Sequence, residues 1–170
     1  MAAVRPSHGA EPEDARDSRS AIVGQGSSTV AGQRRLTLPR SMSLKRRSWI
    51  RPLFDRSRSD VQSVANGCIR ILFRIVEEDD PSSSTRVFAG FSPGRGFKRA
   101  VDRNRIKRLL RESFRTNQGI LQDHVPASGI LTMMILYRHR DLKPFSHVDS
   151  DIAKSLERMT DKLAGAQHHG

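Results

Sequence analysis

The sequence of 170 residues lacks a second cysteine, a membrane-length apolar run and enough acids to balance its bases. The lone cysteine, Cys68, excludes an intramolecular disulfide and is typical of a reducing compartment. The longest apolar run, GILTMMILY at 129–137, is about half a transmembrane helix and fits a buried strand better. Residues 1–20 have no apolar core and carry four acids, unlike a secretory or transit peptide. We therefore expect a soluble cytoplasmic protein that binds no membrane.

The shortage of acids leaves 30 Lys and Arg against 18 Asp and Glu, a net charge of +12. The excess is concentrated: residues 40–58 hold seven Arg and Lys against one acid, and residues 93–115 hold nine against two. Cations gathered in this way repel one another in the folded state and usually face a polyanion. The charge pattern therefore predicts a surface that binds nucleic acid.

Composition divides the chain into an N-terminal extension and one domain. Residues 1–38 have few large apolar side chains and cannot offset the entropy of ordering, so we expect them to be disordered. We place the folded domain at residues 39–165 and a frayed C-terminus at 166–170.

Local patterns predict six elements in the domain. A short amphipathic helix is expected within 44–54, followed by a strand in CIRILFRIV (68–76), whose odd positions are all apolar. After the loop EEDDPSSST, the segment RVFAGFS (86–92) predicts a second strand that pairs with the first as a hairpin-like unit.

A basic helix then runs from about residue 99 and stops by Gly119, the apolar run 129–137 gives a third strand, and a last helix ends at Gly165. The order helix, strand, strand, helix, strand, helix predicts an α+β fold, a small two-layer α/β sandwich.

The basic helix has two unlike faces. On a helical wheel, an apolar stripe spans an arc of roughly 140° and comprises Ile106, Leu109, Leu110 and Phe114. The opposite arc comprises Asn104, Lys107, Arg108, Arg111 and Arg115, with Arg105 at its border. Arg103 projects towards the apolar side, and we expect it in the first turn, where it still reaches solvent.

The basic arc has few acids to neutralise it. A solvated helix face normally interleaves acids at i,i+4 spacing, whereas this one has only Asp102 and Glu112, away from its centre. The planar guanidinium of arginine also makes two hydrogen bonds to a phosphate. We therefore interpret the arc as a nucleic-acid contact. A basic-zipper region that binds DNA would continue into heptads, but the pattern stops by Gly119, so we do not expect DNA as the partner.

The segment AVDRNRIKRLLRESF (100–114) closely resembles the Arg-Asn-Arg signature of the bacterial ribonuclease P protein component. The matching positions are Arg103, Asn104, Arg105, Lys107, Arg108, Arg111 and Glu112. Upstream, LKRRSWIRPLFDRSRS (44–59) is similar to the family's first helix, and IRILF to its first strand.

This resemblance implies a protein that joins a catalytic RNA and helps it remove the 5′ leader from precursor tRNA. It also implies a ribosomal-protein-like fold in which the basic helix lies in a left-handed βαβ crossover. A cleft between the first helix and the sheet would hold single-stranded leader at Ile50, Phe54 and Phe73. Many relatives have Phe at the position of Ile50, where apolar contact would replace stacking here.

The resemblance extends the RNA-binding set beyond the helix. The loop before it reads SPGRGFKRAV, with Pro93 and two shifted glycines, and keeps its charge in Arg95, Lys98 and Arg99. The basic flank of the first helix adds Arg46 and Arg47.

The sequence offers no protein-borne catalytic group. The acidic cluster EEDD at 77–80 fits a solvated turn, and the histidines beyond the N-terminal extension are scattered at 124, 139 and 147 or lie near the C-terminus at 168 and 169. We therefore expect no catalytic residue, metal site or cofactor on the protein, and Mg²⁺ to be required by the RNA component. The alternative is a non-enzymatic ribosomal or RNA-chaperone protein that uses the same basic helix. A DNA-binding protein ranks after that.

Overall fold

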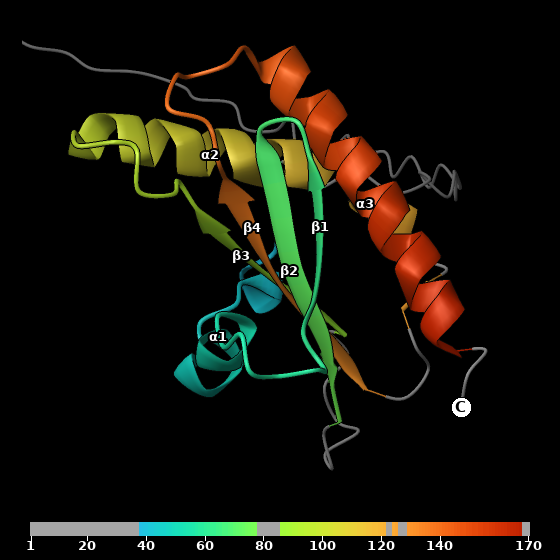
Figure 1. Ribbon diagram of the computed structural model, residues 1–170. Helices are drawn as coiled ribbons and strands as arrows, with labels where there is room; N and C mark the ends of the chain where they lie inside the picture. The colour runs from blue at the N-terminus through green and yellow to red at the C-terminus, as the bar shows by residue number, and fades with distance from the viewer. Residues whose placement is uncertain (1–37, 78–85, 122–123, 126–128, 168–170) are drawn as a thin grey trace, which may run out of the picture. The chain divides into compact units, whose positions relative to one another are not determined.

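The computed structural model describes residues 38–77, 86–121, 124–125 and 129–167 (Figure 1). In chain order the elements are the 3₁₀ turn η1 (Arg40–Met42), α1 (Arg47–Leu53), β1 (Gln62–Asn66), β2 (Ile69–Val76), β3 (Val87–Ser92), α2 (Ala100–Asn117), the 3₁₀ turn η2 (Gln118–Leu121), β4 (Ile130–Tyr137) and α3 (Phe145–Gln167). The α+β class is therefore confirmed. Apart from Leu38, the expected disordered extension lies outside the described residues, as does most of the acidic loop and of the C-terminal end. No helix in the described ranges is both long and apolar enough to cross a bilayer.

The four strands form one sheet in the order β1-β2-β4-β3. β4 pairs antiparallel with β2 and parallel with β3, so the predicted hairpin of β2 with β3 is wrong. The physical reason lies in β4, which is buried along nearly its whole length. A continuously apolar strand needs a neighbour on each side and cover on both faces, so it occupies the interior of the sheet and separates the other two.

β1 is an element that the predicted order does not contain. It pairs antiparallel with β2 through a two-residue turn at Gly67 and Cys68, with Asn66 opposite Ile69. Gly67 has a positive φ of 49°, which the first residue of such a two-residue hairpin turn requires and which glycine adopts without strain. The strand is short and half polar because it lies at an edge of the sheet.

The helices cover the two faces of the sheet unequally. In Figure 1, β3 and β4 both point upward, α2 passes behind the sheet, and β4 lies to the right of β3. The β3–α2–β4 crossover is therefore left-handed, as the resemblance implied, and it departs from the right-handed rule. α3 packs beside α2 on the same face, and α1 lies on the other.

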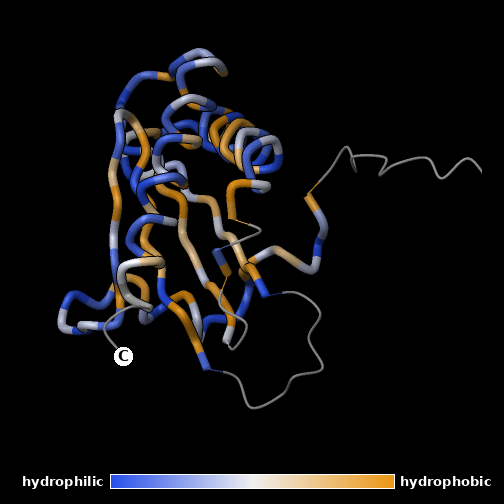
Figure 2. Tube along the Cα trace, turned by 90° about the vertical axis from the view of Figure 1, so that its right-hand side faces the viewer, coloured by the Kyte–Doolittle hydropathy of each residue, from blue (hydrophilic) through white to orange (hydrophobic). Residues whose placement is uncertain are grey.

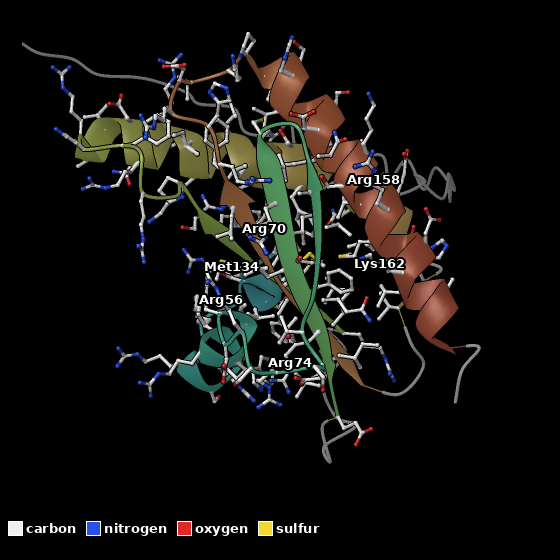
Figure 3. The ribbon with its side chains drawn as sticks, in the orientation of Figure 1. Arg56, Arg70, Arg74, Met134, Arg158 and Lys162 are labelled. Carbon is white, nitrogen blue, oxygen red and sulfur yellow. The ribbon has the colours of Figure 1, made fainter. Side chains whose placement is uncertain are left out.

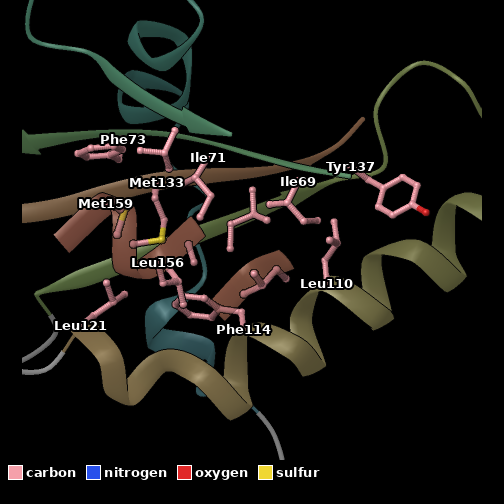
Figure 4. Close-up of a cluster of buried hydrophobic side chains, with 14 of the residues drawn as sticks. Ile69, Ile71, Phe73, Leu110, Phe114, Leu121, Met133, Tyr137, Leu156 and Met159 are labelled. Atoms are coloured by element: carbon pink, nitrogen blue, oxygen red, sulfur yellow. The ribbon is translucent and has the colours of Figure 1, made fainter. Parts of the chain in front are cut away.

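Strand alternation creates two apolar layers. The larger one lies between the sheet and helices α2 and α3 and contains Ile69, Ile71 and Phe73 of β2 (Figure 4). The smaller one lies on the α1 side, where Leu72 and Met134 meet Leu44 and Leu53. Figure 2 shows hydrophobic residues dominating the strands, while the helices alternate between hydrophobic and hydrophilic. Both faces of the sheet are thus apolar, with a large layer under α2 and α3 and a small one under α1.

Candidate nucleic-acid interface

The apolar stripe of α2 fixes which of its side chains face solvent. Ile106, Leu110 and Phe114 are fully buried against the sheet and α3, as the wheel predicts. The opposite face is exposed and carries Asn104, Arg105, Lys107, Arg108 and Arg111. Within the described residues, no acid forms an ion pair with the basic side chains of this set. The exposed face of α2 is therefore a row of cations that no acid of the described ranges neutralises.

Arg103 and Arg115, at the two ends of this row, have partners within the protein. The Arg103 guanidinium donates hydrogen bonds to the carbonyl oxygens of Phe97, at 3.2 Å, and Lys98. It lies in the first turn, as expected, and it holds the loop before α2 in place. Arg115 is partly buried and donates from Nε to Glu112 at 3.1 Å. This hydrogen bond lowers the pKa of the Glu112 carboxyl and neutralises the only acid of the last turns of α2.

A groove of about 610 Å³ opens between the end of α1 and the ends of β3 and β4. We call it the central groove. Its walls are formed by Phe54, Arg70, Ser92, Gly94, Arg95, Gly96, Leu136, Tyr137, Arg138, His139 and Arg140. Four of these residues are arginines and none is an acid. The Phe54 side chain, at 52% exposure, supplies a large apolar surface beside them.

Tyr137 organises one wall of the central groove. Its buried hydroxyl donates to the carbonyl oxygen of Asp141 at 2.7 Å and accepts from the Lys143 N–H at 2.9 Å. Both bonds close the loop that presents Arg138 and Arg140. Burial raises the pKa of the Tyr137 phenol, so it remains a neutral donor at physiological pH.

The loop before α2 forms the facing wall. Gly94 has a φ of 69°, and a Cβ there would lie 2.3 Å from the Tyr137 carbonyl oxygen. The Phe97 ring also packs on the Tyr137 ring, with centroids 5.8 Å apart. Gly94 therefore permits a close approach of this loop to the end of β4, and Arg95 is presented at the groove.

The three residues expected to line a cleft separate in the structure. Phe54 lines the central groove, but Phe73 is only 1% exposed and packs in the core under α2 and α3. Placing Phe73 in the cleft is wrong, because odd positions of β2 face away from α1. Ile50 is partly buried. It packs against the small apolar layer that contains Leu44 and Leu53, and it does not line the central groove.

The other basic residues predicted outside α2 do not line the central groove. Arg47, Lys98 and Arg99 are exposed, and the Arg46 guanidinium stacks over the Trp49 ring at 4.5 Å. Sequence reasoning missed Arg70, Arg138 and Arg140 as groove residues. Figure 3 shows Arg70 on β2, near Met134 of the adjacent strand. For Arg70, the even position in its strand could have indicated that it faces α1. For Arg138 and Arg140, the signal was their place just after an apolar strand.

Reactive side chains are not assembled into a site in the described part of the chain. No group of three His, Cys, Asp or Glu residues there is placed to hold a metal ion. Cys68 is buried, and burial with the nearby Asp151 carboxylate raises its pKa to about 12, so the thiol stays protonated. The described surface thus has two cationic features, the exposed face of α2 and the arginine-lined central groove.

Comparison with known proteins agrees with this geometry. A family model described as Ribonuclease P matches residues 38–160, which includes every element from η1 to most of α3. Proteins named ribonuclease P protein component from two strains of Porphyromonas gingivalis are 32% identical over 92 residues, covering 54% of this chain and 66% of theirs. The protein of that name from Nitrosococcus oceani is 42% identical over 66 residues, covering 39% of this chain and 47% of its own. The matched regions thus span less than two thirds of these relatives. Because the family model covers most of the chain, this protein belongs to the Ribonuclease P family.

Proposed function

We propose that this protein is the RNA-binding subunit of a ribonuclease P ribonucleoprotein, which removes the 5′ leader from precursor tRNA. The observation that carries the proposal is the exposed row Arg105, Lys107, Arg108 and Arg111 on α2, which lies within the family match. Side chains that repel one another in the free protein are stabilised when phosphates lie between them. The catalytic RNA would bind along this row through its phosphates.

The central groove would receive the single-stranded leader. An exposed aromatic ring stacks on any base and is worth roughly 1–3 kcal/mol per base, so it accepts many sequences. Phe54 offers such a ring, and the four arginines around it offer contacts to the backbone phosphates. A subunit that must accept many different leaders needs this sequence-tolerant chemistry.

The RNA would carry the chemistry, with Mg²⁺ bound by the RNA rather than by the protein. Folding a large RNA and docking a second one brings phosphates together, and either Mg²⁺ or protein cations can screen their repulsion. The protein would therefore lower the Mg²⁺ concentration that cleavage requires without changing the reacting groups. We place this activity in the bacterial cytoplasm.

The test is a Mg²⁺ titration of leader release by the cognate RNA, with and without the full-length protein. We expect the midpoint to shift to lower Mg²⁺ when protein is present, and no cleavage by protein without RNA. Arg108→Ala should reduce the shift, and Lys154→Ala, an exposed cation on α3, should not. An unchanged midpoint would refute the proposal. Sequencing of the co-purified RNA would identify a ribosomal or chaperone role if other RNAs were found instead.

A further inference from the structure

A second groove, of about 680 Å³, lies between the N-terminal segment of the domain and α2. We call it the flank groove. It is lined by Leu38, Pro39, Arg40, Ser43, Lys45, Arg108, Arg111 and Glu112. The signature of α2 supplies one wall, whereas Arg40 and Lys45 on the other belong to the basic segment 40–58 but are not among the residues predicted individually to bind RNA.

Backbone pairing holds the outer wall of the flank groove in position. Ser43 forms a parallel bridge with Ala89 of β3, and the Leu44 N–H donates to the Ala89 carbonyl oxygen at 3.0 Å. The Leu44 side chain is buried in the layer under α1. The segment therefore lies along the outer edge of β3, with Arg40 and Lys45 fixed on either side of the bridge.

The flank groove has an excess of positive charge. Among the described residues of its lining, four are cations and one, Glu112, is an acid, which is hydrogen-bonded to Arg115. Arg40, Lys45 and Arg108 are exposed and form no ion pair with an acid within the described ranges. Cations facing one another across a groove destabilise it unless an anion lies between them.

The shape of the lining indicates which anion. Arg111, a lining residue, places its guanidinium over the ring of the partly buried Phe91, 5.8 Å from the ring centre. No exposed ring is present among the lining residues for a base to stack on, in contrast to Phe54 in the central groove. The flank groove therefore favours phosphates over bases, and base-paired RNA presents phosphates while it hides its bases.

We infer that the flank groove is a binding site for the sugar–phosphate backbone of a base-paired RNA segment, gripped by Arg40 and Lys45 on one side and by Arg108 and Arg111 on the other. This inference rests on the proposed function, because it assigns a second wall to the α2 face. It adds two binding residues that lie outside the helix. It also separates the two grooves by ligand: paired RNA in the flank groove and single-stranded RNA in the central groove.

The experiment measures binding of the full-length protein to two fluorescent probes, an RNA hairpin with a fully paired stem and an unstructured oligouridine of equal length. Arg40→Ala and Lys45→Ala are each titrated at a series of salt concentrations. We expect weaker binding to the hairpin and a slope of log K against log salt that is shallower by about 0.9 for each lost phosphate contact. Oligouridine binding should change less.

Lys154→Ala is the matched control for Lys45→Ala, because Lys154 is an exposed lysine on α3 outside both grooves. The site would be overturned if Arg40→Ala and Lys45→Ala showed the wild-type slope of log K against log salt. A loss of hairpin affinity no larger than that of Lys154→Ala would overturn it as well. Equal losses on both probes would overturn the assignment to paired RNA.

Arg105→Ala, on the α2 face but outside the flank groove, separates this inference from the function on which it rests. If Arg105→Ala weakens binding of the cognate RNA while Arg40→Ala and Lys45→Ala do not, only the flank-groove site fails. If all three variants bind the cognate RNA as the wild type does, the proposed function fails as well.

Discussion

The carboxylate of Asp151 in α3 accepts a hydrogen bond from the backbone N–H of Cys68 in the β1–β2 turn, across 2.9 Å. The same carboxylate accepts from the Asn66 side-chain amide at 3.1 Å. A Cβ on Gly67 would lie 2.1 Å from its Oδ2 atom. One acid therefore fastens the last helix to the hairpin, and the glycine between its two donors leaves room for it.

We predict that Asp151→Ala lowers the free energy of unfolding by about 1.5–3 kcal/mol, the range for hydrogen bonds to a charged group. Urea denaturation measures the change, and Glu157→Ala, an exposed acid of the same helix, serves as the control. Gly67→Ala should also destabilise the fold, because it adds a steric clash to an unfavourable positive φ. Equal midpoints for Asp151→Ala and Glu157→Ala would contradict the fastening role.

How far the sequence predicts the fold depends on whether the information is local. The two faces of α2 and the burial of β4 follow from periodicity and from a continuous apolar run, and the structure confirms both. The β1–β2 hairpin was also locally encoded, since Gly67 at the first position of a two-residue turn is a hairpin signal that the prediction missed. The pairing of β3 with β4 is not local, because it depends on which strand occupies the interior of the sheet.

The same distinction explains the candidate site. The cations of α2 were predictable because one helix presents them all. The central groove was not, because Phe54, Arg95 and Arg138 come from three segments that only the strand order brings together. Phe73 was misplaced because an aromatic residue on a strand fits either face equally well until the neighbouring helices are positioned.

On α2 we predict that binding and stability separate by face. Arg108→Ala should weaken RNA binding and make the slope of log K against log salt shallower by about 0.7–0.9, with an unchanged melting temperature. Leu110→Ala, two residues further along but fully buried, should instead cost about 2–5 kcal/mol of stability. Salt-dependent titration and thermal denaturation of both variants measure this. If the two variants changed the salt slope and the melting temperature in the same way, the two faces of α2 would not be distinct in function.

Arg103 should behave differently from its neighbours on α2. Its guanidinium is engaged with the carbonyl oxygens of Phe97 and Lys98, so Arg103→Ala frees the loop rather than removing a phosphate contact. We expect weaker RNA binding with an unchanged salt slope, together with faster hydrogen exchange in the loop before α2. A shallower slope, equal to that of Arg108→Ala, would show instead that Arg103 contacts phosphate directly.

The Cys68 thiol should make stability depend on pH in the alkaline range. Its pKa is about 12 in the folded protein against 9.0 for an ordinary thiol, so between these values the unfolded state loses its proton first. Stability is therefore full below pH 9 and falls as pH rises towards 12. Urea midpoints measured across this range should fall less steeply for Cys68→Ala than for the wild type. The native thiol should also resist alkylation until the protein is unfolded.

The exposed ring of Phe54 provides the sharpest test of the central groove. Phe54→Ala should weaken binding of precursor tRNA by roughly 1–3 kcal/mol, the value of one stacked base, while binding of mature tRNA, which has no leader, should not change. Because Phe54 is 52% exposed, its truncation should leave the melting temperature nearly unchanged.

Two further variants separate stacking from apolar contact. Phe54→Trp keeps an aromatic surface and should bind precursor tRNA as the wild type does, whereas Phe54→Leu keeps only apolar bulk. The test compares Kd for precursor and mature tRNA with the protein assembled on its RNA. If Phe54→Leu bound as tightly as Phe54→Trp, plain apolar contact would replace stacking as the explanation. If Phe54→Ala weakened precursor and mature tRNA equally, the groove would not be where the leader lies.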